Sequence, residues 1–324
     1  MKDADGRLID YARISITDRC NLRCVYCMPK EGAAMLTHDD ILTYEEIVTV
    51  ARALAVLGIR YLKITGGEPM ARIGCLSLIK KLKSIPGIEE VSMTSNGILL
   101  DGHMQEAVDA GLDGLNISLD TLVPEQYARM TRLGEVEKVL SVLSQAVAAG
   151  IPSVKVNAVP IRGYNEDSLV GLARLAEHDP IHVRFIELMP VGCGGGFAPV
   201  SQEEIMKKLE AAFGPLSPER SVHGHGPALY VHPAGFKGSI GFISAVSHAF
   251  CAQCNRVRIT ADGQLKLCLN HAAGVPLKPL LRSGAGEAEL KKVMREAIYQ
   301  KPLRHGFGER LPDQEDRKMF QIGG

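Results

Sequence analysis

The stretch YARISITDRCNLRCVYC, residues 11–27, joins an apolar run to three closely spaced cysteines. The apolar run predicts a strand over Tyr11–Thr17, and the cysteines follow it as C-x3-C-x2-C at Cys20, Cys24 and Cys27. Cysteine thiolates are the usual protein ligands of iron–sulfur clusters. Three thiolates leave one iron of a [4Fe–4S] cluster without a protein ligand. The spacing therefore predicts chemistry carried out at an open iron.

A zinc site is the alternative, since structural zinc takes four ligands. For the first triplet His38 is the only plausible fourth ligand nearby. A second triplet has the spacing C-x2-C-x13-C and consists of Cys251, Cys254 and Cys268. Here His248 or His271 could complete a zinc tetrahedron. Beside a first three-cysteine site, a second open [4Fe–4S] cluster is the preferred interpretation.

The chain between the triplets alternates strand and helix patterns. Six apolar, β-rich runs are predicted strands: Tyr11–Thr17, Tyr61–Thr65, Glu90–Thr94, Gly114–Ser118, Ser153–Val159 and His182–Ile186. The predicted helices between them are Thr43–Leu57, Leu76–Lys83, His103–Ala110, Val136–Ala149 and Ser168–Glu177. This alternation predicts an α/β fold of parallel βα units. Six units are too few for a closed eight-stranded barrel, so we expect a partial (βα)6 barrel.

The pattern changes after Met189-Pro190. A helix is predicted over Gln202–Phe213, short strands follow from about Ala228, and a last helix covers Glu287–Gln300. We therefore expect two domains: a barrel over residues 1–225 and a smaller C-terminal α+β domain over residues 226–324, which carries the second cluster.

Composition excludes several classes of protein. The 324 residues carry 37 Lys+Arg and 37 Asp+Glu, so no global field attracts nucleic acid or an anionic membrane. No apolar run approaches the roughly 18 residues of a membrane span, and the N-terminus lacks the apolar core of a signal peptide. We expect a cytoplasmic protein, in which eight cysteines indicate metal binding or catalysis before disulfides.

Several basic residues lie at the ends of the predicted strands: Arg13, Lys63, Lys155, Arg184, Arg256 and Arg258. An unpaired charge inside an apolar strand is costly, so these side chains are expected to face one cavity and bind phosphates. Solvated surface cations are the simpler alternative. His223 and His225 indicate a mobile Gly/Pro-rich loop in preference to metal ligands. Cys75 and Cys193 are expected to be free thiols.

These residues resemble a known superfamily. The first cysteine motif with Tyr26 before its last cysteine, followed by Gly66-Gly67-Glu68-Pro69 after the second strand, resembles the radical S-adenosylmethionine (SAM) superfamily. The second triplet, Asn255-Arg256-Val257-Arg258 and the terminal Gly323-Gly324 resemble the GTP 3′,8-cyclase family, which begins molybdenum cofactor biosynthesis. The resemblance covers essentially the whole chain.

The resemblance implies two [4Fe–4S] clusters and SAM as cofactors. The first cluster would bind Cys20, Cys24 and Cys27, and the second Cys251, Cys254 and Cys268. SAM contacts are implied for Tyr26, Gly67, Ser118 and Met189. GTP contacts are implied for Arg13, Lys63, Thr94, Lys155, Arg184, Arg256, Val257 and Arg258. The terminal glycines would insert into the active site. The second strand departs from the family, because it carries Tyr61 and Lys63 where relatives often have two basic residues.

The implied reaction is that of a lyase. A 5′-deoxyadenosyl radical removes hydrogen from C3′ of GTP, and the C3′ radical attacks guanine C8 to give (8S)-3′,8-cyclo-7,8-dihydroguanosine 5′-triphosphate. No catalytic acid–base pair is expected. Implied partners are a reductant such as flavodoxin or ferredoxin and a downstream cyclic pyranopterin monophosphate synthase, and a homodimer is left open. The rival readings are a radical SAM enzyme that modifies peptide or RNA, and a zinc-binding structural protein.

Overall fold

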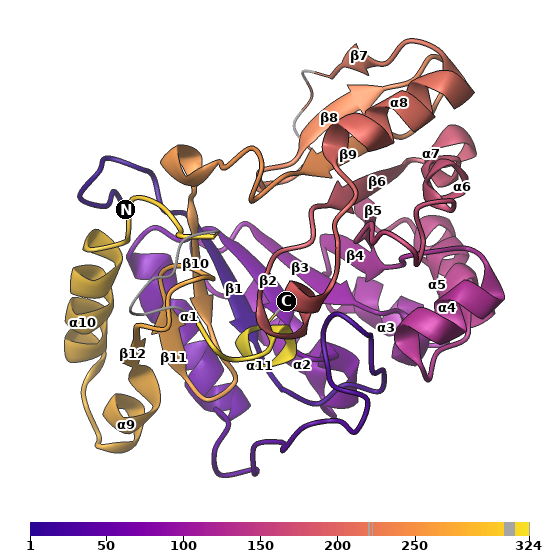
Figure 1. Cartoon of the computed structure of the whole chain (residues 1–324). Coiled ribbons are helices and arrows are strands. Elements are labelled where there is room, and N and C mark those ends of the chain that lie inside the picture. Colours follow the sequence, from indigo (N-terminus) through magenta and orange to yellow (C-terminus); the bar gives the residue numbers. More distant parts are fainter. Residues whose placement is uncertain (220, 222, 308–314, 324) are drawn as a thin grey trace.

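One sheet organises the computed structural model, which describes residues 1–219, 221, 223–307 and 315–323 (Figure 1). Its strands are β1 Tyr11–Ser15, β2 Tyr61–Thr65, β3 Glu90–Ser95, β4 Gly114–Ser118, β5 Ser153–Ala158, β6 Ile181–Ile186, β7 Ser217–Pro218, β8 Leu229–His232, β9 Ile240–Ile243, β10 Arg256–Ile259, β11 Gln264–Lys266 and β12 Gly274–Pro276. Their spatial order is β12-β11-β10-β1-β2-β3-β4-β5-β6-β9-β8-β7. The sheet therefore has two edges and stays an open, partial barrel.

The six predicted strands are confirmed as parallel neighbours, β1 to β6. The later part of the chain extends this parallel core on both sides. β10 pairs in parallel with β1, and β9 pairs in parallel with β6. Beyond them, β11 and β12 on one side and β8 and β7 on the other are antiparallel. The division into residues 1–225 and 226–324 stays a prediction.

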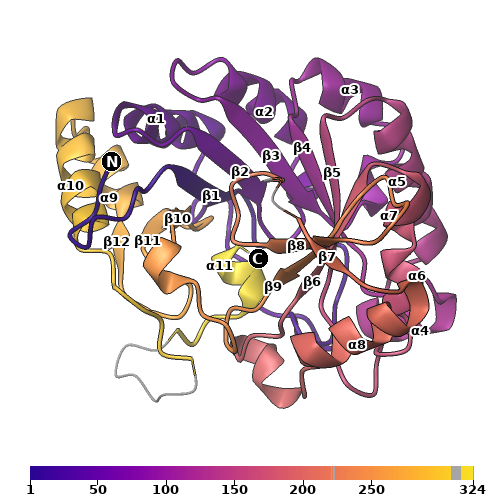
Figure 2. The ribbon, with the colours of Figure 1, turned by 90° about the horizontal axis from the view of Figure 1, so that it is seen from above.

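Helices cover the outer face of the parallel strands (Figure 2). The helices of the described residues are α1 Tyr44–Val56, α2 Cys75–Lys83, α3 Met104–Asp109, α4 Pro124–Thr131, α5 Val136–Ala148, α6 Leu169–Ala173, α7 Leu175–His178, α8 Gln202–Phe213, α9 Leu277–Arg282, α10 Glu287–Tyr299 and α11 Met319–Ile322. Four short 3₁₀ turns are η1 Pro69–Ala71, η2 Ile98–Leu100, η3 Gly192–Gly196 and η4 Cys251–Gln253. No helix among the described residues is long and apolar enough to cross a membrane.

Local sequence explains most of these bounds. Thr43 begins α1 with a capping box, in which its side chain and that of Glu46 bond each other's backbone N–H groups. The helix predicted over Ser168–Glu177 is divided at Arg174 into α6 and α7. Helix α4 was not predicted, because its polar composition hides the apolar period of a helix.

Strand alternation separates an apolar outer face from a polar interior. Ile14, Leu62 and Leu115 are fully buried in the core beneath the helices. The intervening residues, such as Arg13 and Lys63, pair in register across β1 and β2 and line an internal cavity. Because side chains alternate along a strand, one polar residue in every two suffices to build this interior.

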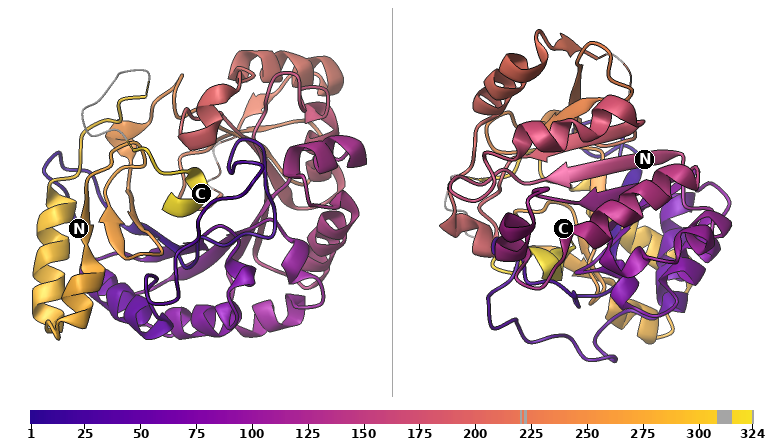
Figure 3. Two further views of the ribbon diagram at one scale, coloured as in Figure 1. Left: turned by 60° about the horizontal axis from the view of Figure 1, so that its bottom comes forward. Right: turned by 90° about the vertical axis from the view of Figure 1, so that its right-hand side faces the viewer.

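The C-terminal tail returns to the middle of the barrel, where α11 lies in two views (Figures 2 and 3). Phe320 and Ile322 are buried. Gly323 has φ +88°, and a Cβ on it would lie 2.8 Å from the side chain of Ser15 and 3.3 Å from that of Thr65. Only glycine fits this close approach to the two strands.

Candidate active site

The first cysteine triplet lies in the loop that follows β1. The backbone N–H groups of Cys27 and Met28 both donate to the carbonyl oxygen of Cys24, at 3.0 Å each, which makes a tight turn. Cys20 Sγ accepts from the backbone N–H of Leu22 at 3.4 Å and from Asn96 Nδ2 at 3.8 Å. These donors orient the Cys20 sulfur. The loop itself lies at the C-terminal ends of the strands.

Helix α4 holds this loop in place. Val25 N donates to the carbonyl oxygen of Met130 at 2.9 Å. Arg132, the residue that ends α4, has φ 66°, which is uncommon outside glycine. From that position Arg132 Nη1 donates to the carbonyl oxygens of Arg23 at 3.1 Å and Met28 at 2.9 Å. Helix α4, which the sequence did not predict, therefore supports the first cysteine triplet, which the sequence did predict.

The chemistry of the first triplet fits a cationic cluster. Burial raises the pKa of Cys20 to about 11 and that of Cys27 to about 12. Burial also raises the pKa of Cys24 well above its usual value, and the neighbouring charges of Cys27 and Cys20 raise it further. Three such thiols become thiolates together only beside compensating positive charge, which the irons of a cluster provide. These residues could hold the first [4Fe–4S] cluster.

The second triplet lies at the opposite end of the barrel. Cys251 is in η4, Cys254 lies two residues before the start of β10, and Cys268 follows β11. Since β10 runs parallel to β1 with Tyr11 opposite Arg256, Cys254 lies at the N-terminal ends of the parallel strands. The antiparallel pairing of Lys266 with Arg258 brings Cys268 to the same end.

Cations surround the second triplet. Burial raises the pKa of Cys254, but the charges of Arg256 and Lys301 outweigh it and lower the pKa to about 7. Cys251 Sγ accepts from the backbone N–H of His305 at 3.4 Å. A thiolate is therefore favoured at Cys254, as cluster ligation requires. These residues fit a second [4Fe–4S] cluster.

The histidines considered as zinc ligands for the second triplet have other contacts. His248 contacts the hydroxyl of Ser247, and His271 Nε2 lies 3.2 Å from the carbonyl oxygen of Arg304. In the part of the chain that the structure describes, no group of three or more His, Cys, Asp or Glu is arranged for a single metal ion. In a [4Fe–4S] cube each thiolate binds its own iron, so the sulfurs do not converge on one point.

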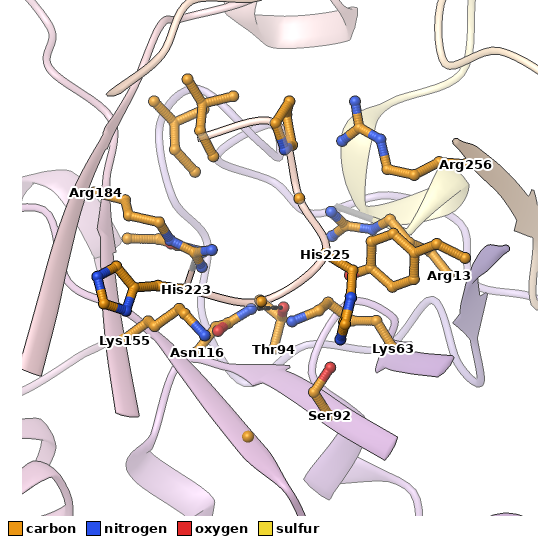
Figure 4. Close-up of a pocket in the computed structure, with 18 of the residues that line it drawn as sticks. Arg13, Lys63, Ser92, Thr94, Asn116, Lys155, Arg184, His223, His225 and Arg256 are labelled. Carbon is orange, nitrogen blue, oxygen red and sulfur yellow. Dashed lines mark hydrogen bonds between the residues drawn. The ribbon is translucent and has the colours of Figure 1, made fainter. Parts of the chain in front are cut away.

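A cation-lined cavity lies inside the barrel (Figure 4). Its walls include residues of β1, and the two triplets lie toward opposite ends of that strand. Five of the lining residues are basic: Arg13, Lys63, Lys155, Arg184 and Arg256. Neutral hydrogen-bonding groups share the wall: Ser92, Thr94, Asn116 and Asn157. Arg184 Nε donates to Asn157 Oδ1 at 2.8 Å, and Asn116 Nδ2 donates to Thr94 Oγ1 at 3.4 Å. The cavity suits a polar, multiply charged anion.

The prediction that these cations lie at strand ends holds for Arg256, which begins β10, and is wrong for the other four. Arg13 and Lys63 are the middle residues of β1 and β2, and Lys155 and Arg184 are internal to β5 and β6. They can occupy mid-strand positions because the interior of this open barrel is hollow there. Burial, and then the charge of Arg184, lowers the pKa of Lys155 to about 8 and that of Lys63 well below its usual value.

Two of the expected GTP contacts lie outside the cavity lining. The side chain of Val257 is fully buried in the apolar core, because alternation along β10 turns it away from Arg256 and Arg258. Arg258 Nη1 donates to the carbonyl oxygen of Gly323 at 2.6 Å. Arg258 therefore binds the C-terminal tail above the cavity, while Arg256 lines the cavity itself.

The four residues expected at SAM lie toward the C-terminal ends of the strands. Tyr26 is in the cysteine loop and donates its hydroxyl to Asp120 Oδ2 at 2.8 Å. Gly67 follows β2, and a Cβ on it would lie 2.4 Å from the carbonyl oxygen of Arg19, so only glycine fits there. Ser118 ends β4, and Met189 follows β6. The structure brings these positions to the end of the barrel that carries the first triplet.

Glu68 connects the loop that follows β2 to the end of β3. Its carboxylate accepts from Ser95 Oγ at 2.9 Å, from the backbone N–H of Asn96 at 2.7 Å and from that of Met70 at 3.0 Å. Burial raises the pKa of Glu68 to about 6. A fully buried carboxylate beside Gly66-Gly67 suits an ammonium group, as SAM carries.

Sequence reasoning missed the loop that bears His223 and His225. These histidines were assigned to a mobile segment, but both line the cavity. Asn116 and Asn157 were missed too, although each lies in an apolar strand at the same alternation as Ser118 and Lys155. Residues two apart on a strand point to the same face of the sheet, and this relation to Ser118 and Lys155 could have identified both asparagines. Cys75 is buried in the core, and Cys193 lies in η3.

Comparison with known proteins agrees with this geometry. Residues 14–176 match the Radical SAM superfamily, and residues 181–307 match the family Molybdenum Cofactor Synthesis C. The chain is 45% identical over 327 residues to the GTP 3′,8-cyclase of Pelotomaculum thermopropionicum and 45% identical over 328 residues to that of Moorella thermoacetica, with 100% of each chain covered. A Streptococcus suis SuiB structure bound to S-adenosylmethionine shares the fold, with a TM-score of 0.63 and 13% identity over 92% of this chain and 67% of that one. The chain therefore belongs to the GTP 3′,8-cyclase family of the radical SAM superfamily.

Proposed function

We propose that this chain cyclises GTP inside the barrel, with the cation-lined cavity holding the triphosphate and the two cysteine triplets holding clusters on either side of the nucleotide. One observation carries the proposal: two three-cysteine sites lie at opposite ends of the parallel strands, and a cavity with five cations lies between them. A redox protein or a structural zinc protein has no use for this cavity.

The cofactors supply the radical chemistry when they are bound. The residues of the chain bind and orient the substrate. Arginine side chains make bidentate contacts to phosphate oxygens, so Arg13, Arg184 and Arg256 are suited to fix the triphosphate. Thr94, Asn116 and Asn157 offer hydrogen bonds for ribose hydroxyl groups. Because a radical reacts with the nearest C–H bond, this fixed pose selects the reacting carbon.

Enclosure completes the role of the protein. The tail, held by Arg258, lies over the strands above the cavity, and Gly323 packs against Ser15 and Thr65. A closed chamber keeps water and other hydrogen donors from the reactive centre. No general acid–base pair is needed for this step.

The test is hydrogen transfer from GTP. Anaerobically reconstituted protein is mixed with SAM, a reductant and GTP deuterated at C3′, and 5′-deoxyadenosine is analysed by mass spectrometry. We expect one deuterium in 5′-deoxyadenosine and a GTP isomer that separates by chromatography. GTP deuterated at C2′ is the matched control and should transfer none. Unlabelled 5′-deoxyadenosine with C3′-labelled GTP would refute the proposal.

We also propose the setting of the reaction. The protein would work in the cytoplasm, receive electrons from a small donor such as flavodoxin or ferredoxin, and pass its product to a cyclic pyranopterin monophosphate synthase. The charge balance of the chain and the oxygen sensitivity of open clusters support this setting. Product consumption on adding the synthase tests the last step. The homodimer stays a prediction.

A further inference from the structure

The segment His223–Pro227, here called the histidine loop, lines the cavity with all five of its residues (Figure 4). It connects β7 to β8 in the antiparallel hairpin at one edge of the sheet. In Figure 4 it passes between Lys155 and Arg184 on one side and Lys63, Arg13 and Arg256 on the other. The function proposed above gives this loop no role.

His225 is fixed by three different parts of the barrel. Its ring stacks on that of Tyr61 at the start of β2, with 3.3 Å between ring centroids and 6° between planes. Its Nε2 lies 2.9 Å from Oε2 of Glu90, the first residue of β3. Its carbonyl oxygen accepts from Asn255 Nδ2 at 3.2 Å. The imidazole is therefore held at the N-terminal ends of the strands, facing a carboxylate.

The other half of the loop lies across the barrel. His223 Nε2 is 2.8 Å from Glu219 Oε1, and its ring stacks on that of His182 with 3.8 Å between centroids. Gly224 has φ +89°, and a Cβ on it would lie 3.3 Å from Lys155 Nζ. Glycine therefore permits the backbone of the loop to approach a cavity cation closely.

Glu90 is the one carboxylate among the described residues that line the cavity. Its negative charge opposes any phosphate that the five cations attract. The hydrogen bond from His225 is the largest cause that lowers the pKa of Glu90, burial raises the pKa, and the charges of Lys155 and Lys63 lower it further. A carboxylate partner favours the charged form of a histidine side chain. The two side chains therefore lie as a hydrogen-bonded pair inside the cation cluster.

We propose that His225 is a substrate-positioning residue, which as an imidazolium pairs with Glu90 and so leaves the cations of the cavity unopposed for the triphosphate. This inference rests on the proposed function, because it assumes that the cavity binds GTP. An uncompensated charge about 10 Å from a phosphate, at an effective dielectric constant of about 20, changes affinity by about tenfold. Loss of the His225 charge should therefore cost about tenfold in phosphate binding.

The experiment measures binding by anaerobic calorimetry on the holoenzyme without SAM. The two probes are GTP and inorganic tripolyphosphate. His225→Ala should weaken both by about tenfold, and His225→Gln, which keeps a donor for Glu90 but no charge, should weaken both similarly. Adding Glu90→Gln to His225→Ala should restore affinity to within about threefold of the wild type. His103→Ala is the matched control, because His103 is an exposed histidine 3.1 Å from Glu106 and far from the cavity in sequence and fold; it should bind both probes as the wild type does.

The outcomes separate the inference from the function. Wild-type affinity in His225→Gln, or no recovery on adding Glu90→Gln, overturns the role of His225 and leaves GTP cyclisation untouched. A packing role alone would produce the second result, since removing the Glu90 charge does not refill the space of an imidazole. If the wild-type holoenzyme binds neither probe, the proposed function itself is refuted, and the role of His225 is refuted with it. Iron content and melting temperature verify that each variant is folded.

Discussion

Replacing Lys155 by methionine should stabilise the GTP-free protein and weaken its binding of GTP. Lys155 is only 5% exposed. Burial, and then the charge of Arg184, lowers its pKa from 10.5 to about 8. Since one pKa unit corresponds to about 1.4 kcal/mol, the charged ammonium costs the folded protein about 3 kcal/mol at neutral pH. Methionine fills a similar volume without the charge, so most of this cost should disappear.

The pH dependence has a definite sign. Between about pH 8 and pH 10.5 the unfolded chain keeps the Lys155 proton that the folded protein has lost, so stability rises with pH in this window. The destabilisation by the Lys155 charge therefore has its full value below about pH 8 and vanishes toward pH 10.5. The stability gap between Lys155→Met and the wild type should be large at pH 7 and should close as the pH approaches that upper limit.

The assay is thermal unfolding of the anaerobic holoenzyme with and without GTP. At neutral pH the variant should melt several degrees higher without GTP, and GTP should raise its melting temperature less than that of the wild type. Lys138→Met, at an exposed lysine near Glu135, is the matched control and should melt like the wild type. Two results would show that the Lys155 charge does not destabilise the folded protein. One is a variant that melts lower than the wild type at neutral pH, and the other is a difference in stability between the two proteins that is independent of pH.

Three further predictions concern the clusters and the tail. Cys24→Ala should lower the iron content from about eight to about four per chain, whereas Cys75→Ala, in the core, should keep about eight; loss of all iron from Cys24→Ala would show that the two sites are not independent. Arg256→Ala should weaken GTP binding by at least about tenfold in calorimetry while the iron content stays constant, and normal GTP turnover would place the phosphate site elsewhere. Deleting Gly323-Gly324 removes the carbonyl acceptor of Arg258; cyclised product should fall relative to total 5′-deoxyadenosine in chromatography at constant iron, and an unchanged ratio would leave the tail without a role in the reaction.

The sequence was sufficient for elements that local patterns determine. The six strands were predicted within about two residues because each is a short apolar run bounded by glycine or polar residues. The cysteine triplets were found because ligand spacing is a local property. Helix α1 was found because an apolar stripe and the Thr43 cap lie in one continuous segment.

The rest depends on contacts between distant segments. Nothing near Pro124–Thr131 indicates that this helix supports a loop one hundred residues earlier, as Arg132 does through Arg23 and Met28. The histidine loop likewise acquires its position from residues distant in sequence, such as Tyr61 and Glu90. Four of the cations were misplaced because functional residues of βα folds usually lie at strand ends, whereas this open barrel keeps a hollow at mid-strand.

The pairing of β1 with β10 has a consequence for how the chain is made. Asp10 and Asn255, which hydrogen-bond beside this pair, are 245 residues apart. During synthesis β1 emerges early and keeps an unpaired flank until β10 leaves the ribosome, and unpaired strand flanks attract wrong partners. Misassembly should therefore threaten the nascent chain most before its final quarter, which contains β10, has emerged, and chaperone protection of that flank would matter most in that period.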